Sequence, residues 1–158
     1  MTLTIKKDNV LAAFKAASPE QKTLLENLFG KEVIPGKIED RIKDFNDICA
    51  EAGVDPADFV IPVGASQRQI GSIAFNRIQL IFEVANEGWE ADWDNSNQPK
   101  YYIIWKYTPG SGFSSYGCAD TYSASYVGSR LSTFSAERAK WIAETFRNEF
   151  NQFLTKTN

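Results

Sequence analysis

Residues 100–107 read KYYIIWKY, and this stretch decides the fold because it is the clearest strand in the chain. Aromatic and β-branched residues favour strands, and nothing at its ends caps a helix. Side chains of a strand alternate between two faces, so one face would carry four apolar residues: Tyr101, Ile103, Trp105 and Tyr107. The other, amphipathic face would carry Lys100, Tyr102, Ile104 and Lys106. We expect the first face to pack inward.

The residues around this stretch indicate further strands. A turn at 108–110 should lead into a second strand at about 113–119, and a third strand is expected over about 125–134. Together with the polar loop that precedes them, these strands would form a small antiparallel β-meander over residues 88–134.

A helical hairpin is predicted near the start of the mainly helical part, residues 1–87. A short helix over about 8–17 is followed by a second helix over 18–30. The second helix begins with a capping box, because Ser18 can accept from the backbone while the Gln21 side chain reaches back.

Two more helices are predicted before the polar loop. Over 38–53, apolar residues recur at helical spacing up to a glycine, which places Cys49 on the buried side. A second capping box, Ser66 with Gln69, opens a helix that runs to about residue 86. This helix is apolar nearly all round, so we expect it at the centre of the fold.

A last helix is predicted in residues 135–158. Ser135 is its N-cap, and an apolar stripe over about 136–154 should cover the sheet. Helices followed by strands and a closing helix are typical of the α+β class, since a parallel sheet would need strands and helices to alternate. The sequence therefore predicts a single α+β domain over residues 1–158.

Composition narrows the function classes. The chain has 158 residues, a net charge of -3, two cysteines and no histidine. This charge disfavours binding to nucleic acid or to an anionic membrane. Without histidine, the commonest general base and metal ligand are missing. We therefore predict no enzyme activity, no catalytic residue and no cofactor.

The beginning of the sequence, MTLTIKKDNV, lacks the apolar stretch of a signal peptide. No run reaches the ~18 apolar residues that a membrane span needs. Two cysteines are also too few for a disulfide framework. We therefore expect a cytoplasmic protein that has no membrane partner.

The polar loop groups oxygen-bearing side chains, as the start of a calcium loop does: Asp92, Asp94, Asn95 and Asn97. The spacing then departs from such a loop. Its sixth position is Asn97 instead of glycine, and its twelfth is Ile103 instead of glutamate. We predict no bound metal, and expect these side chains to accept hydrogen bonds from nearby backbone.

The stretch GFSSYGCADTYSASYVGSRL interleaves small residues with three tyrosines, which are Tyr116, Tyr122 and Tyr126. Tyrosine offers a large contact area at low entropy cost, while serine and glycine form adaptable hydrogen bonds. The tract is therefore either a binding surface or an ordinary meander with small residues beneath packed rings. Trp89 and Trp93 could extend a binding surface. Arg130 either pairs with a carboxylate of the 92–94 loop or binds an anionic partner.

Three segments carry a resemblance to a known group of proteins: LLENLFGKEV, NEGWEADWDNSNQPKYYIIW and YVGSRLSTFSAERAKW. In these segments the chain resembles a family of small proteins encoded by gut Bacteroidetes, their phages and their mobile elements. The family has no assigned activity, so the resemblance implies an origin and no mechanism. Its strand reads like KYYPWF where this chain has KYYIIW at 100–105. The missing proline should make this strand a better hydrogen-bond donor.

We therefore expect a non-enzymatic binding or interaction protein of phage or mobile-element origin, which contacts a protein partner through a Tyr/Ser-rich β surface. One alternative is a structural virion or assembly component, which would form a homo-oligomer. Another is a small-ligand or nucleotide-binding protein, or an enzyme, that uses Asp92, Asp94 and Arg130. The leading interpretation requires the tyrosine tract to face outward.

Overall fold

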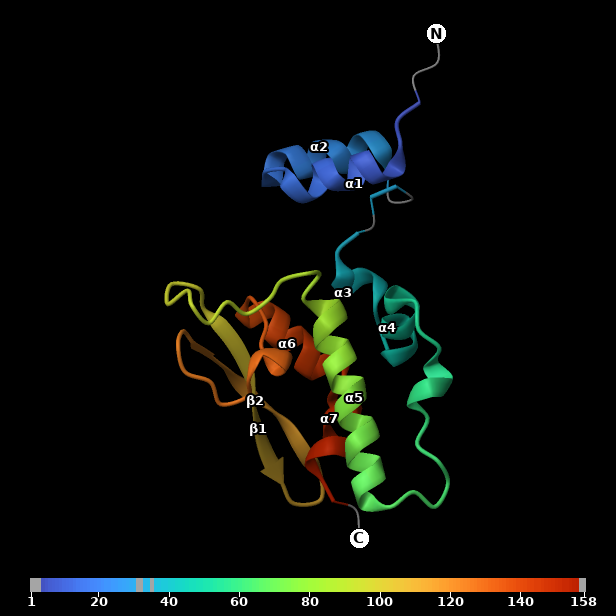
Figure 1. Ribbon diagram of the computed structural model, residues 1–158, viewed down its shortest axis with the longest axis vertical. Coiled ribbons are helices and arrows are strands. Elements are labelled where there is room, and N and C mark those ends of the chain that lie inside the picture. The colour runs from blue at the N-terminus through green and yellow to red at the C-terminus, as the bar shows by residue number, and fades with distance from the viewer. Residues whose placement is uncertain (1–3, 31–32, 35, 157–158) are drawn as a thin grey trace. The chain divides into compact units, whose positions relative to one another are not determined.

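The computed structural model describes residues 4–30, 33–34 and 36–156. Over these residues the fold is α+β, with seven α-helices and a two-stranded antiparallel sheet (Figure 1). The predicted fold class is therefore confirmed. The chain divides into two compact units, Met1–Arg41 and Ile42–Asn158, which are described in turn, and the single domain stays a prediction. None of the helices in the described ranges combines the length and apolar character needed to cross a membrane.

The first unit contains a helical hairpin and a short helix. Helices α1 (Lys7–Ala16) and α2 (Pro19–Phe29) form the predicted pair, and α3 spans Ile38–Arg41. The Ser18 N–H donates to Gln21 Oε1 at 2.9 Å, and Ser18 Oγ accepts from the Gln21 N–H at 3.4 Å. The predicted capping box is therefore confirmed.

Helix α5 (Gln67–Ala85) runs through the middle of the second unit, where it packs against α4 (Phe45–Ala52) and α7 (Arg147–Leu154) (Figure 1). Its predicted capping box is present, because the Gln69 N–H donates to Ser66 Oγ at 3.3 Å and the Ser66 N–H donates to Gln69 Oε1 at 2.9 Å. Its buried residues are Ala74, Ile78, Ile81, Phe82 and Ala85. The predicted central position of this helix is confirmed.

The helix expected over 38–53 is two helices, α3 and α4, separated by residues 42–44. Asp44 has an extended backbone, and its Oδ1 accepts from the Asp47 N–H at 3.0 Å, so it begins a new helix as an N-cap. Cys49 is buried as predicted, and this burial raises the pKa of its thiol.

The link between α4 and α5 contains a short 3-10 helix, η1 (Pro56–Phe59). From α5, Arg77 Nε donates to the Phe59 carbonyl oxygen at 2.9 Å. The guanidinium carbon of Arg77 also lies 5.4 Å from the centroid of the Phe45 ring in α4. Arg77 therefore ties the link to both of the helices that it joins.

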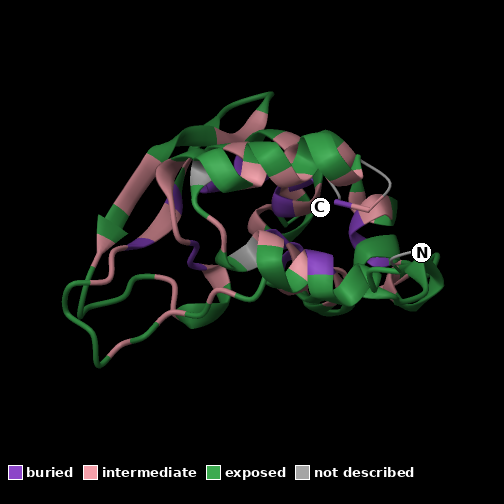
Figure 2. Ribbon diagram, turned by 90° about the horizontal axis from the view of Figure 1, so that it is seen from above, coloured by how far each residue is buried: buried purple, intermediate pink, exposed green. Residues whose placement is uncertain are grey.

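The sheet is a hairpin of β1 (Lys100–Thr108) and β2 (Gly112–Thr121), which confirms the first two predicted strands. The strands pair antiparallel, from Lys100 opposite Thr121 to Thr108 opposite Gly112. Within the two strands only Lys100 and Ile103 are buried, and the other residues are intermediate or exposed (Figure 2). Most of the hairpin surface is therefore accessible.

A β-bulge interrupts the pairing in the middle of the hairpin. Gly117 lies opposite Ile104, whereas Ser115 lies opposite Trp105. Tyr116 is therefore the extra residue of β2, and a bulge of this kind locally bends and twists the strand.

The third strand expected over 125–134 is not confirmed. These residues form a turn that contains a 3-10 helix, η2 (Ser129–Leu131). Thr133 forms an isolated bridge to β1: the Tyr101 N–H donates to the Thr133 carbonyl at 2.8 Å, and the reverse bond measures 2.9 Å. Ser125 Oγ accepts from two backbone N–H groups inside the turn. Such local side-chain bonds compete with a strand ladder.

The segment 136–154, expected as one helix, forms α6 (Ala136–Thr145) and α7, with a break at Phe146 (φ -111°, ψ 26°). The Phe150 N–H donates to the Phe146 carbonyl at 3.2 Å, so helical hydrogen bonding continues through the break. Both helices pack on the sheet, where the Trp105 and Phe150 ring centroids are 4.5 Å apart. The prediction that this segment covers the sheet is confirmed.

Helix α7 also caps the open edge of β2 at Phe113. The Asn151 side chain pairs with the Phe113 backbone as a neighbouring strand would: its Nδ2 donates to the carbonyl and its Oδ1 accepts from the N–H, both at 2.8 Å. Arg147 Nε donates to the same carbonyl at 2.9 Å. At Gly112 (φ +74°), an added Cβ would lie 2.6 Å from Asn151 Oδ1, so a side chain there would be strained and crowded.

Replacing Asn151 with alanine should lower the free energy of unfolding by about 1–2 kcal/mol, because both backbone groups of Phe113 would lose the amide that pairs with them. Urea denaturation measures this change. Asn148→Ala, at an exposed position of the same helix, is the matched control and should change the value by less than about 0.5 kcal/mol. Equal effects of the two substitutions would contradict the edge-capping role.

Candidate functional site

Side chains of the loop before β1 hydrogen-bond to the loop's own backbone, as the sequence predicts. Asp92 Oδ1 accepts from the Asp94 N–H at 3.0 Å, and Asn95 Oδ1 accepts from the Asn97 N–H at 3.0 Å. The Asp92 N–H donates to Gln98 Oε1 at 2.7 Å. Across the described part of the chain, no three His, Cys, Asp or Glu side chains group as metal ligands would. The oxygens of this loop therefore organise the loop itself.

The same loop encloses the ammonium of Lys100, a side chain that is 0% exposed. Lys100 Nζ donates to the carbonyls of Gln98 at 2.9 Å and Asn95 at 3.2 Å, and it lies 5.2 Å from the centroid of the Trp93 ring. A buried ammonium needs such partners, because it has lost its hydration. Lys100 is therefore a structural residue, although the alternation of β1 assigns it to the amphipathic face.

Both tryptophans that the sequence singles out are half-buried. Trp93 Nε1 donates to Ser129 Oγ at 2.6 Å, which joins the loop to the turn that contains η2. The Trp89 ring lies 6.3 Å from the Phe134 ring in an edge-to-face arrangement. Trp93 therefore has a structural role, because it joins the loop to the turn. Trp89 packs against Phe134 and, in addition, lines a pocket.

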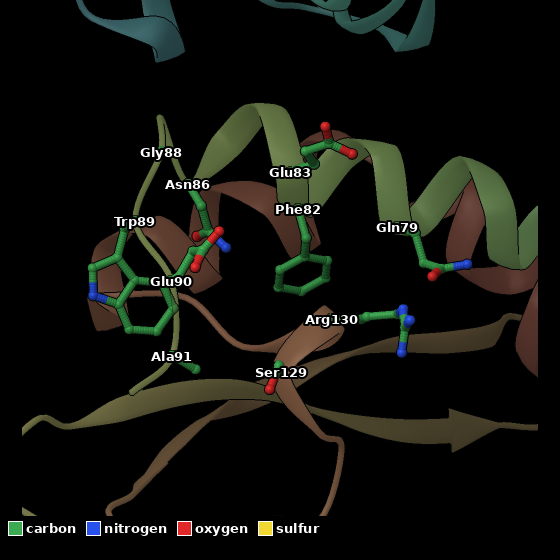
Figure 3. A pocket seen from close by; sticks show the side chains of 10 residues that line it. All are labelled: Gln79, Phe82, Glu83, Asn86, Gly88, Trp89, Glu90, Ala91, Ser129 and Arg130. Atoms are coloured by element: carbon green, nitrogen blue, oxygen red, sulfur yellow. The ribbon is translucent and has the colours of Figure 1, made fainter. Parts of the chain in front are cut away.

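This pocket has a volume of about 420 Å³ and lies between the second half of α5, the loop that follows it and the turn at Arg130 (Figure 3). It brings together Trp89 and Arg130, two of the residues expected at a site. No ion pair joins Arg130 to Asp92 or Asp94 in the described chain, and Arg130 instead lines the pocket. The residues important for its chemistry are Phe82, Glu83, Asn86, Trp89, Glu90 and Arg130.

Asn86 contributes a buried polar group to the pocket wall. The residue is 8% exposed, and its Nδ2 donates to the Ser132 carbonyl at 2.9 Å. Its Oδ1 has no hydrogen-bond donor among the described residues. Leaving a buried acceptor unpaired costs about 1–3 kcal/mol, and the unpaired oxygen adds negative potential to the pocket wall. Sequence reasoning identified Asn86 only as the end of a helix.

The hairpin has an inner and an outer face. On the inner face, the Trp105 ring contacts Phe150 of α7, and Cys118 Sγ donates to the Ala136 carbonyl of α6 at 3.9 Å. Because side chains alternate along each strand, the even-numbered residues of β1 from Tyr102 point away from both helices. The outer face therefore comprises Tyr102, Ile104 and Lys106, with the two tyrosines that contact them, Tyr116 and Tyr126.

Ring and cation contacts hold this outer face together. The Tyr102 and Tyr126 ring centroids are 5.7 Å apart, and Lys106 Nζ lies 5.4 Å from the centroid of the Tyr116 ring. Tyr116 is 71% exposed and Tyr126 is 82% exposed, so their phenol rings remain accessible. Of the three outward tyrosines expected from the sequence, two lie here. The alternation of β1 was the signal that could have added Tyr102 to them.

Tyr122 is also exposed, but it interacts with Asp120 and not with the residues of the outer face. Asp120 lies opposite Tyr101 in the hairpin, and Tyr101 is one of the odd-numbered residues of β1 that alternate with the outer face. The negative charge of Asp120 raises the pKa of the Tyr122 phenol above its ordinary value, and a hydrogen bond to Asp120 adds to the effect. Tyr122 is therefore not part of the outer face.

Asp120→Asn should lower the pKa of Tyr122 toward the ordinary value for tyrosine, because the carboxylate that opposes ionisation would be gone. The tyrosinate absorbance gives the titration, and Tyr122→Phe assigns the Tyr122 signal among the six tyrosines. Asp58→Asn, in η1, is the control and should leave this pKa unchanged. An unchanged titration in the Asp120 variant would show that the carboxylate does not act on Tyr122.

Comparisons with protein-family models, curated proteins and solved structures found no match to this chain. The resemblance to the Bacteroidetes and phage family therefore stays an expectation. What the chain does is accordingly inferred from two features of its own geometry, the outer face of the hairpin and the pocket beside α5.

Proposed function

We propose that this chain is a non-enzymatic interaction protein that binds a protein partner through the outer face of its hairpin. The observation that carries the proposal is the exposure of Tyr116 and Tyr126, at 71% and 82%, beside Tyr102 and Lys106 of β1. An origin in phages or mobile elements and a cytoplasmic location, both expected from the sequence, are part of the same proposal.

The chemistry of the outer face suits a protein surface. Tyr102, Tyr116 and Tyr126 combine a large apolar ring with a hydroxyl, and tyrosine is enriched in the central contacts of protein interfaces. Ile104, which is 38% exposed, adds an apolar side chain between them. Tyr102 and Tyr116 stand on the hairpin backbone, and the Tyr126 ring packs on Tyr102 from the turn that follows β2, so part of the side-chain entropy of these rings is already lost before binding.

The charge of the outer face favours a protein partner over a nucleic acid. Lys106 is the cation of this face, since Lys100 is enclosed by the loop. One lysine is too little to neutralise a run of phosphates, and the net charge of the chain is -3. The exposed rings therefore act as contact area for another protein.

A hollow of about 740 Å³ between β2 and α6 adjoins the outer face at Tyr116. Ser115 and Cys118 line it from the strand, and Glu137 and Lys140 line it from the helix. A partner that covers Tyr116 would have room there for a side chain of its own. We therefore place the centre of the contact at the bulge.

The test is a double substitution, Tyr116→Ala with Tyr126→Ala. The wild-type protein is first used to select binding peptides from a random peptide library displayed on yeast. The affinity of each selected peptide for the wild-type protein and for the double variant is then measured by fluorescence anisotropy. Loss of two central rings should weaken binding by at least about tenfold. Circular dichroism and thermal unfolding establish that the variant keeps its fold.

Tyr122→Ala is the matched control, because this exposed tyrosine contacts Asp120 and lies off the outer face. Its affinity for the selected peptides should match that of the wild-type protein. The proposal fails if the wild-type protein selects no peptide, or if the double variant binds the selected peptides as tightly as the wild type does.

A further inference from the structure

We propose that the pocket beside α5 binds a small zwitterion whose ammonium and carboxylate are separated by an apolar chain, of the class of ω-amino acids. The pocket measures about 420 Å³, which lies within the usual range for small-molecule sites. Its residues are not those of the outer face, so the inference stands without the proposed function.

Arg130 defines the end of the pocket that receives the carboxylate. Its side chain is exposed, and it forms no hydrogen bond or ion pair with any other described residue. Figure 3 shows it at the opposite side of the pocket from Trp89 and Glu90. A guanidinium binds a carboxylate through two parallel N–H bonds, so Arg130 fixes the orientation of the ligand.

The other end of the pocket is suited to an ammonium. Glu90 supplies a carboxylate, and the buried Asn86 Oδ1 supplies an acceptor without a donor. The Trp89 ring offers a face that attracts cations. This end also lies at the C-terminus of α5, where the negative end of the helix dipole favours a positive charge. All four features favour a positive charge at this end of the pocket.

The middle of the pocket is apolar, because Phe82 lies between the two ends (Figure 3). A purely anionic ligand would be repelled by Glu90, and a purely cationic ligand by Arg130. A ligand with both charges and an apolar body complements the whole site. An ω-amino acid meets this requirement, because its apolar chain holds the ammonium and the carboxylate apart and would cross the middle of the pocket.

The experiment is a titration of the full chain, labelled with nitrogen-15, with a series of ω-amino acids of increasing chain length. Chemical shifts of the Trp89 indole N–H and the Asn86 side-chain amide report binding inside the pocket. We expect at least one ω-amino acid to shift both signals. The amine and the carboxylic acid that match this ligand, each lacking one charged group, should bind at least about tenfold more weakly.

Two exposed residues are substituted to test the two ends, because changing Asn86 would also break its bond to the Ser132 carbonyl. Arg130→Gln and Glu90→Gln should each weaken binding by about tenfold or more. Arg68→Gln, an exposed arginine in the first turn of α5 outside the pocket, should leave affinity unchanged. The proposal is overturned if no ω-amino acid binds at about 10 mM, if Arg130→Gln binds as the wild type does, or if the amine alone binds as tightly as the ω-amino acid.

Discussion

A sheet of two strands is at most marginally stable in water, so the hairpin depends on the packing of its inner face against α6 and α7. Trp105 stacks against Phe150, and Ile103 is 8% exposed beside it. Because alternation couples the two faces, this packing also decides which side chains point outward. The outward position of Tyr102, Ile104 and Lys106 is thus a consequence of what is buried on the opposite side of the same strand, and Tyr116 and Tyr126 contact these residues from the bulge and from the turn after β2.

Structural features that depend on residues close together in the sequence could be predicted. Both capping boxes involve residues three positions apart, Ser18 with Gln21 and Ser66 with Gln69, so no distant part of the chain is needed to recognise them. The strand at 100–108 was likewise visible from its alternation. Apolar periodicity alone could not show where a helix breaks, because the buried stripe of Ile142, Phe146 and Phe150 continues across the break between α6 and α7.

The features that were missed depend on contacts between distant residues or on competition among local bonds. A third strand was expected over about 125–134, but the Ser125 side chain accepts from backbone N–H groups that a ladder would use. The burial of Lys100 results from the way the preceding loop folds back over it. The pocket exists because the bond from Asn86 to Ser132 brings the end of α5 to the turn at Arg130. No local sequence pattern predicts that these two segments lie side by side, although Trp89 and Arg130 were each predicted to be site residues.

The two edges of the hairpin bear on how it can associate with other chains. The backbone of Tyr101 is engaged by Thr133 at the β1 edge, and that of Phe113 by Asn151 at the β2 edge. Between them, the bulge at Tyr116 bends the strand out of the straight line that a stacking neighbour would follow. Strand addition by another chain is therefore disfavoured at these positions, and the exposed aromatic face of the hairpin is left as its more open surface.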